Sequence, residues 1–362
     1  MKRLMIILAL SFLLATPALA TDIAQEQAKL LQTDKIQESL TEDTRSLLEE
    51  LNPLNTGDLR TEATGIIQKA LTKAQEPLSA AIKTCVCILL IILLGSTVSS
   101  LELAGRAVSL CTCVGILACF LGDLTGMLQS GITAIEELTT FSRALLPVMA
   151  GALAASGAGT SSAALYSCSM MALQIMLSVL KNVLLPILYA YIAIAGAGHC
   201  LGTNALDRFG KVLCSIMKNS LRFLLFAFSG LLSLTGIISG QADALTLKAT
   251  KATVSSTVPV VGNMISDATE TILVSAKLLA NSVGVFGMLA VLAILVIPFL
   301  QMGIRYLLLQ ITGALAAVVG EGESLRLLDT LSTAMGYLFA MTCVCGLLTF
   351  ISCICFMKVS VF

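Results

Sequence analysis

The sequence predicts an all-α, polytopic transmembrane helical bundle with two internal repeats containing Pro-broken helices, preceded by a short extracytoplasmic helical segment. Three observations predict this class. Of the 362 residues, 57% are hydrophobic and only 12% are charged, whereas a soluble domain holds about 25% charged residues. Several apolar runs reach the roughly 20 residues that a transmembrane helix needs. Prolines recur in pairs, at one fixed spacing, along the apolar part of the chain.

Residues 1–20 are typical of a cleaved secretory signal peptide. A positive start, Lys2-Arg3, is followed by an apolar run and by a small-residue cleavage site, Ala18-Leu19-Ala20. The alternative is an uncleaved membrane anchor. Cleavage is favoured because the apolar run is too short to span a membrane. We therefore expect the segment that follows to be exported.

The segment 21–83 is polar, with 11 acidic and 7 basic residues and no cysteine. Amphipathic patterns predict short helices in it, which Asn52-Pro53 and Asn55-Thr56-Gly57 are expected to break. The segment is either a solvated helical lead-in to the membrane or a docking surface for an exported partner. The lead-in is the simpler interpretation.

Residues 84–128 are expected to form the first two transmembrane helices, at 88–104 and 107–128. Arg106 lies in the turn between them. The positive-inside rule places Arg106 in the cytoplasm, which agrees with an exported segment before the first helix.

The rest of the membrane part contains two long apolar regions, 144–201 and 283–319, each interrupted by a proline. Both are too long for one crossing, so each must tilt, break or fold back. With simple spans at 223–239 and 335–356, we expect six to eight spans in total. A basic stretch before residue 223 is expected on the cytoplasmic side: Arg208, Lys211, Lys218 and Arg222.

The prolines predict the two repeats. The chain has only seven prolines; Pro147 and Pro186 are 39 residues apart, and so are Pro259 and Pro298. Pro-Val opens both copies, and the apolar residues around the second proline of each pair align at the same shift. The predicted organisation is a signal peptide, an extracytoplasmic segment, two transmembrane helices and two membrane repeats: 1–20, 21–83, 84–128, 129–240 and 241–358.

The paired interruptions indicate elements that line a pathway. Irregular backbone at membrane depth is tolerated only where protein buries it or where it lines a water-filled cavity. Interrupted helices in two halves of a chain are typical of transporters, and charged residues in membrane segments are functional candidates. The alternative is that small residues only let helices pack closely. The candidate pathway and hinge residues are Pro147, Gly151, Gly157, Pro186, Pro259, Gly262, Pro298, Lys181 and Lys277.

No pattern in the sequence indicates catalysis, a cofactor or a metal site. Eight of the twelve cysteines form Cys-x-Cys pairs, whose side chains point about 200° apart on a helix and cannot bind one ion from one face. His199 is the only histidine, and its sequence neighbours offer no clear partner. The chain has no phosphate-binding Gly-x-x-x-x-Gly-Lys-Ser/Thr motif, so another subunit would supply any ATP hydrolysis. The formal net charge of zero gives no indication of nucleic-acid binding.

One stretch carries a family resemblance. It runs from Leu145-Leu146-Pro147 through Gly157 to Ser161-Ser162-Ala163-Ala164. With the signal peptide and polar lead-in before it, this stretch resembles the stage III sporulation protein AE family. The likeness covers about residues 25–358, and its motifs are diffuse and not catalytic signatures.

The resemblance implies a non-catalytic subunit of the channel complex that links mother cell and forespore. It implies a multi-pass protein of the mother-cell membrane, permease-like and needed for forespore development after engulfment. The implied partners are other stage III sporulation membrane proteins, a separate secretion-type ATPase and a forespore membrane protein. The alternative function is a stand-alone transporter or permease for a small solute.

Overall fold

The fold is all-α, as predicted. The computed structural model describes residues 34–48, 59–73, 75–99, 105–157, 159–201, 204–257, 261–319 and 322–361, and no strand occurs among them. The helices are α2 (Asp34–Glu38), α3 (Glu42–Leu47), α4 (Leu59–Lys73), α5 (Gln75–Ser99), α6 (Gly105–Ala155), α7 (Gly159–Val179), the π-helical turn η1 (Leu180–Leu184), α8 (Leu185–Leu201), α9 (Asn204–Thr257), α10 (Val261–Val319) and α11 (Glu323–Val361).

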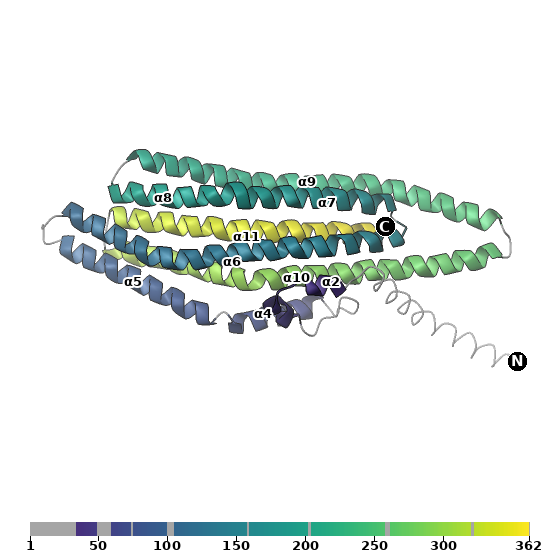
Figure 1. The fold of residues 1–362 in the computed structure, drawn as a ribbon, viewed down its shortest axis with the longest axis horizontal. Coiled ribbons are helices and arrows are strands. Elements are labelled where there is room, and N and C mark those ends of the chain that lie inside the picture. The colour runs from purple at the N-terminus through teal and green to yellow at the C-terminus, as the bar shows by residue number, and fades with distance from the viewer. Residues whose placement is uncertain are drawn as a thin grey trace.

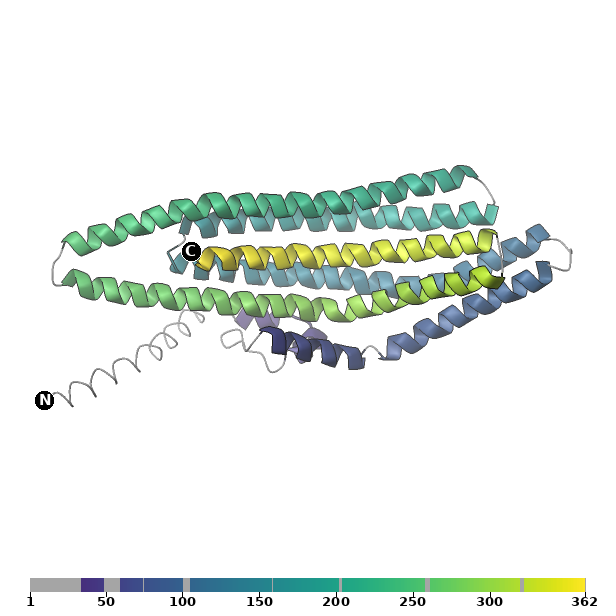
Figure 2. The ribbon, with the colours of Figure 1, turned by 180° about the vertical axis from the view of Figure 1, so that it is seen from behind.

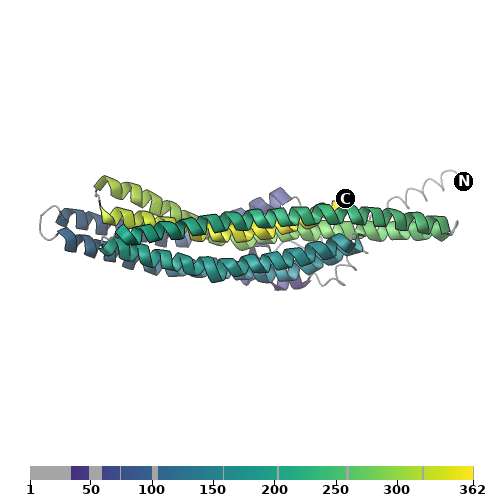
Figure 3. The same cartoon turned by 90° about the horizontal axis from the view of Figure 1, so that it is seen from above.

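The long helices run side by side and form an elongated bundle (Figures 1 and 2). The segments α7, η1 and α8 join into one rod, and α9 lies beside this rod at one edge of the bundle. Seen from above, the bundle is much thinner than it is long (Figure 3). At one end, α5 meets α6, α8 meets α9, and α10 meets α11 (Figure 1). This end therefore brings together segments that lie far apart in the sequence.

Six helices among the described residues are long and apolar enough to cross a membrane, within the predicted range of six to eight. The 25 residues of α5 suit one crossing of a hydrocarbon core about 30 Å thick. The 51 residues of α6, the 54 of α9 and the 59 of α10 make helices about 75 to 90 Å long. These long helices extend far beyond one bilayer thickness.

Helix boundaries differ from those expected. The span predicted at 107–128 is only the first half of α6, which continues through Glu136 and Glu137. The span predicted at 223–239 lies inside α9. The polar residues Glu136 and Glu137 did not end α6, and neighbouring segments provide contacts for them, as described below for Glu136. The predicted segment boundaries at 83, 128 and 240 each lie within a helix.

The predicted Pro-broken helices are not confirmed. Helix α6 continues through Pro147, and α10 continues through Pro298. Before Pro186 the chain forms η1, in which the backbone N–H of Leu185 donates to the carbonyl of Leu180. Such π turns absorb an irregularity without ending the helix. Among the described residues, the apolar region 144–201 instead folds back at Ser156-Gly157, where Gly157 has a φ of 91°, a conformation that glycine adopts readily.

The described parts of the polar lead-in are largely helical, as predicted, and they dock on the bundle. The side chain and the backbone N–H of Thr41 both donate to Glu137 Oε1, at 2.8 and 3.0 Å. Thr41 also caps α3 by accepting from the backbone N–H of Thr44. Residues 1–20, predicted as a signal peptide, lie outside the described residues.

Close helix packing holds the centre of the bundle together. A Cβ added to Gly287 on α10 would lie 2.8 Å from Leu145 Cδ2 on α6, so glycine is what lets these two helices approach. Two buried hydroxyls are satisfied within their own helix: Ser142 donates to the carbonyl of Leu138, and Ser352 donates to that of Leu348. Small residues and self-satisfied hydroxyls are typical of helix interfaces in lipid, where packing drives association.

Candidate functional site

The predicted pathway residues are spread along the bundle. Pro147 is exposed on α6, Gly157 lies in the α6–α7 turn, and Pro298 is buried in α10. Lys277 is half-buried on α10, and Gly151 is half-buried on α6. Pro259 lies outside the described residues, and Gly262 belongs to the first turn of α10. Among the described residues, Lys181 and Pro186 lie close together at the π turn, and Pro147 and Gly151 are about one turn apart on α6.

The π turn carries an ion pair. Lys181 of η1 donates to Glu136 of α6. Both side chains are about half exposed, at 50% and 54%. Exposed ion pairs of this kind contribute roughly 0–1 kcal/mol to stability. The pair therefore orients the ammonium group of Lys181 more than it stabilises the bundle.

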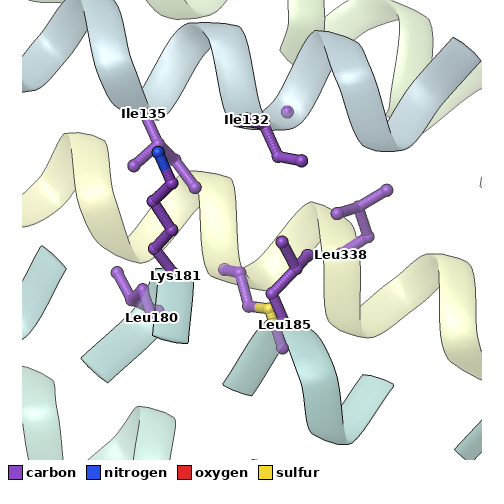
Figure 4. A pocket seen from close by; sticks show the side chains of 8 residues that line it. Ile132, Ile135, Leu180, Lys181, Leu185 and Leu338 are labelled. Atoms are coloured by element: carbon purple, nitrogen blue, oxygen red, sulfur yellow. The ribbon is translucent and has the colours of Figure 1, made fainter. Parts of the chain in front are cut away.

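A small cavity lies beside this ion pair, between α6, the π-turn region and α11 (Figure 4). It has about 10 Å³ of space for a water-sized occupant, which is room for about one water molecule. Its lining is apolar apart from Lys181, and it is too small to hold a solute. The labelled lining residues are Ile132, Ile135, Leu180, Lys181, Leu185 and Leu338.

A second polar site lies at the end of the bundle where three helix pairs meet. His199, in the last turn of α8, is only 6% exposed. Its Nδ1 lies 3.0 Å from Glu323 Oε2 at the start of α11, and its Nε2 lies 3.1 Å from Thr330 Oγ1 on the same helix. Asp207 Oδ1, in the first turn of α9, is 3.8 Å from Nε2. One imidazole thus connects α8, α9 and α11.

Neighbouring contacts strengthen the same junction. Arg326 Nη1 lies 3.3 Å from Glu323 Oε1, so this carboxylate has a partner on each oxygen. Tyr337 Oη donates to the backbone carbonyl of Cys214, at 3.2 Å, and connects α11 to α9. The polar contacts of His199 and Arg326 therefore lie at the shared end of these helices, and the Tyr337 contact holds α11 and α9 together further along the bundle.

The sequence analysis missed this site because both hydrogen-bond partners of His199 are far from it in the sequence. Glu323 is 124 residues away and Thr330 is 131 residues away. One feature of the sequence could have indicated the site: all of these residues lie close to predicted helix ends. Helix ends that meet at one end of a bundle bring such residues together.

The order hydroxyl, imidazole, carboxylate in Thr330, His199 and Glu323 is that of an acyl-transfer triad. A triad also needs hydrogen-bond donors for the developing oxyanion. Thr330 lies inside α11, whose backbone N–H groups donate to its own carbonyls. The contacts of His199 also connect α8 to α11, which is a structural connection. The described residues also contain no group of three His, Cys, Asp or Glu side chains suited to a metal ion.

Comparison with known proteins decides the family. The sequence profile of the family described as stage III sporulation protein AE matches residues 45–360. The chain belongs to this family. The resemblance noted in the sequence is thereby confirmed, and both polar sites of this AE family member lie inside the matched region.

A curated relative is the stage III sporulation protein AE of Bacillus subtilis (strain 168), which is 25% identical over 219 residues. These residues cover 60% of this chain and 55% of that protein, so the match spans about half the relative's length. No solved structure matches the chain. Family membership and six membrane-capable helices together establish a sporulation protein of the multi-pass membrane class.

Proposed function

We propose that this chain is a non-catalytic membrane subunit of the channel complex that links mother cell and forespore. The observation that carries the proposal is the family match over residues 45–360. The six long apolar helices support an integral membrane subunit. The proposed partners are other stage III sporulation membrane proteins, a separate secretion-type ATPase and a protein of the forespore membrane.

In this proposal, the permease-like role is carried out by a pathway that forms between this chain and other chains. Two findings support this over a pathway inside one chain. The candidate pathway residues do not converge on one channel, and the cavity beside Lys181 has room for about one water molecule. A stand-alone solute transporter would need a site that holds its substrate within the bundle.

The N-terminal segment lies outside the cytoplasm in this proposal. The contact between Thr41 and Glu137 then places the second half of α6 on the same side. A cysteine at the exposed Glu38 of α2 tests the orientation, in protoplasts that express the chain during growth. A membrane-impermeant maleimide should label Glu38→Cys above the level of the parent chain. Labelling only after lysis contradicts the orientation.

Deletion of the gene in its spore-forming host tests the function. We expect normal growth, complete engulfment and then collapse or arrest of the forespore. Expression of the intact chain from a second locus should restore heat-resistant spores. Normal sporulation of the deletion strain contradicts the proposal, and uptake assays with small solutes would then test the stand-alone transporter.

A further inference from the structure

The first half of α9 has an unusual composition for a membrane helix. Its candidate span, Ala205–Leu231, has the lowest mean hydropathy of the six candidate spans in the described residues. One face of it packs on the bundle through Met217 and Phe228, both fully buried. The rest of its circumference is open because α9 lies at the edge of the bundle (Figures 1 and 2).

A row of basic side chains occupies one open face of α9. Arg208, Lys211, Lys218 and Arg222 are all exposed, and the exposed Ser215 lies between the two pairs. The steps between these five residues are three, four, three and four. This is the heptad pattern that keeps a row of residues facing one partner helix. We call these five residues the basic row.

An apolar row lies next to the basic row, turned by roughly 100° around the helix. Both ends of this apolar row are aromatic, and Phe226 is 76% exposed. The two rows give α9 a lipid-compatible face and a charged face side by side. The members of the apolar row are Phe209, Val212, Ile216, Phe223 and Phe226.

The four cations of the basic row make no ion pair with any residue that the structure describes. Other cations do find carboxylates: Lys73 pairs with Asp43, and Arg326 pairs with Glu323. Charged side chains in membrane segments are costly in lipid and therefore pair with one another or face water or protein. The basic row, which is expected on the cytoplasmic side, therefore faces water or a partner from outside the described part of the chain.

We propose that the basic row is the docking site for an acidic helix of another protein, with carboxylates at heptad spacing. The inference rests on the proposed function, because it places this chain in a complex. Lipid headgroups fit less well: the row is about 21 Å long, and a headgroup layer is only roughly 5–8 Å thick. Helix α9 runs side by side with α8 and α11 (Figure 1), so a row along α9 extends further than one headgroup layer if these helices cross the membrane.

A second copy of the chain is also a poor occupant. On the described surface of α6, Glu136 and Glu137 are engaged by Lys181 and Thr41. On α11, Glu323 is engaged by His199. These three carboxylates are engaged, and the exposed Asp329 of α11 alone does not form a matching acidic row. Charge complementarity therefore favours a different protein.

Site-specific crosslinking identifies the occupant. A photoreactive amino acid replaces Ser215 in the full chain, and sporulating cells are irradiated. The control position is Leu94 on α5, which is 65% exposed and apolar. We expect a discrete adduct from position 215 and none of the same mass from position 94. Peptide mapping should locate the adduct on a helix with acidic residues three or four positions apart.

Charge exchange then tests whether the pairing is functional. Reversal of all four cations to glutamate should reduce heat-resistant spores to the level of the deletion strain, at normal protein abundance. Lys211→Arg with Lys218→Arg keeps the charge and should sporulate normally. Reversal of the exposed Lys69 and Lys83, which lie off the basic row, is the matched control. Reciprocal acid-to-base changes in the mapped helix should restore spores to the reversed chain.

The outcomes separate this inference from the proposed function. A deletion strain that sporulates normally overturns the proposed function. A defective deletion strain together with a charge-reversed chain that sporulates normally overturns only the docking site. An adduct of twice the chain mass, adducts with lipid alone, no adduct, or a mapped segment without acidic residues also overturn it.

Discussion

His199 Nδ1 lies 3.0 Å from Glu323 Oε2, although 124 residues separate the two in the chain. An ionised carboxylate only accepts hydrogen bonds, so Nδ1 donates to it. Nε2 is then free to accept from the Thr330 hydroxyl, or to donate to it when the ring is charged. Both states of the imidazole are satisfied, which makes this junction of α8 and α11 a stable connection at a buried position.

Removing His199 should destabilise the bundle. His199→Ala loses two hydrogen bonds, one of them to a carboxylate, and we expect the free energy of unfolding in detergent to fall by about 1–3 kcal/mol. In a double-mutant cycle with Glu323→Ala, the coupling energy should be about 0.5–3 kcal/mol. Glu38→Ala removes an exposed carboxylate of α2 and is the control. Additive effects of the two substitutions would contradict a direct contact.

Thr330 should act through packing and one hydrogen bond, not as a nucleophile. Thr330→Val keeps the shape of the side chain and removes its hydroxyl, so the free energy of unfolding should fall by about 0.5–1.5 kcal/mol. Spore yield should stay close to that of the wild type. Thr140→Val, which removes an exposed hydroxyl that donates to its own helix, controls for the substitution. A spore yield as low as that of the deletion strain from stable Thr330→Val protein would support catalysis instead.

The sequence predicted the fold class because composition and apolar run length act locally. The position of η1 was predicted indirectly, because Pro186 indicated an irregular helix there. The sequence predicted a broken helix at this point, whereas the structure has a π turn. A proline removes one backbone donor, and the chain can absorb that loss by a π turn when neighbouring helices hold both sides in line. Which response occurs depends on tertiary packing, which local sequence does not encode.

The candidate site was predicted least well. The predicted span 107–128 ended before Glu136 and Glu137, yet Lys181 and Thr41 engage them along a continuous α6. His199 had no partner within its own segment, and its partners became visible only once α8, α9 and α11 met at one end. Contacts over such sequence distances follow from the arrangement of helices, not from spacing within one of them.

The close contact of α6 and α10 should be sensitive to a single methyl group. An alanine Cβ at Gly287 would lie 2.8 Å from Leu145 Cδ2, and Leu145 is fully buried. We expect Gly287→Ala to destabilise the bundle by about 1–3 kcal/mol through overpacking. Gly126→Ala on α6, where a Cβ meets nothing within 4 Å, should be neutral or stabilising because alanine favours the helix.

A compensating substitution tests the geometry of this contact. Leu145→Ala alone leaves a cavity and should cost about 2–5 kcal/mol. In the double variant the new methyl group fills part of that cavity, so the combined cost should be smaller than the sum of the two. Unfolding in detergent, followed by the loss of helical signal, measures all four proteins. A loss of stability in the double variant equal to the sum of the two single losses would show that the helices separate at this point.

The ion pair of Lys181 and Glu136 should matter for orientation more than for stability. Both side chains are about half exposed, so Lys181→Met should change the free energy of unfolding by less than about 1 kcal/mol. Glu136→Lys places two like charges together and should reduce spore yield if the position of the ammonium group beside the cavity is important.

Exchange of the two residues restores the pair but moves the ammonium group to α6. We expect the exchanged chain to be as stable as the wild type and to sporulate poorly, because the charge at the π turn is then negative. Full sporulation of the exchanged chain would assign Lys181 to the ion pair alone and remove it from the candidate pathway residues.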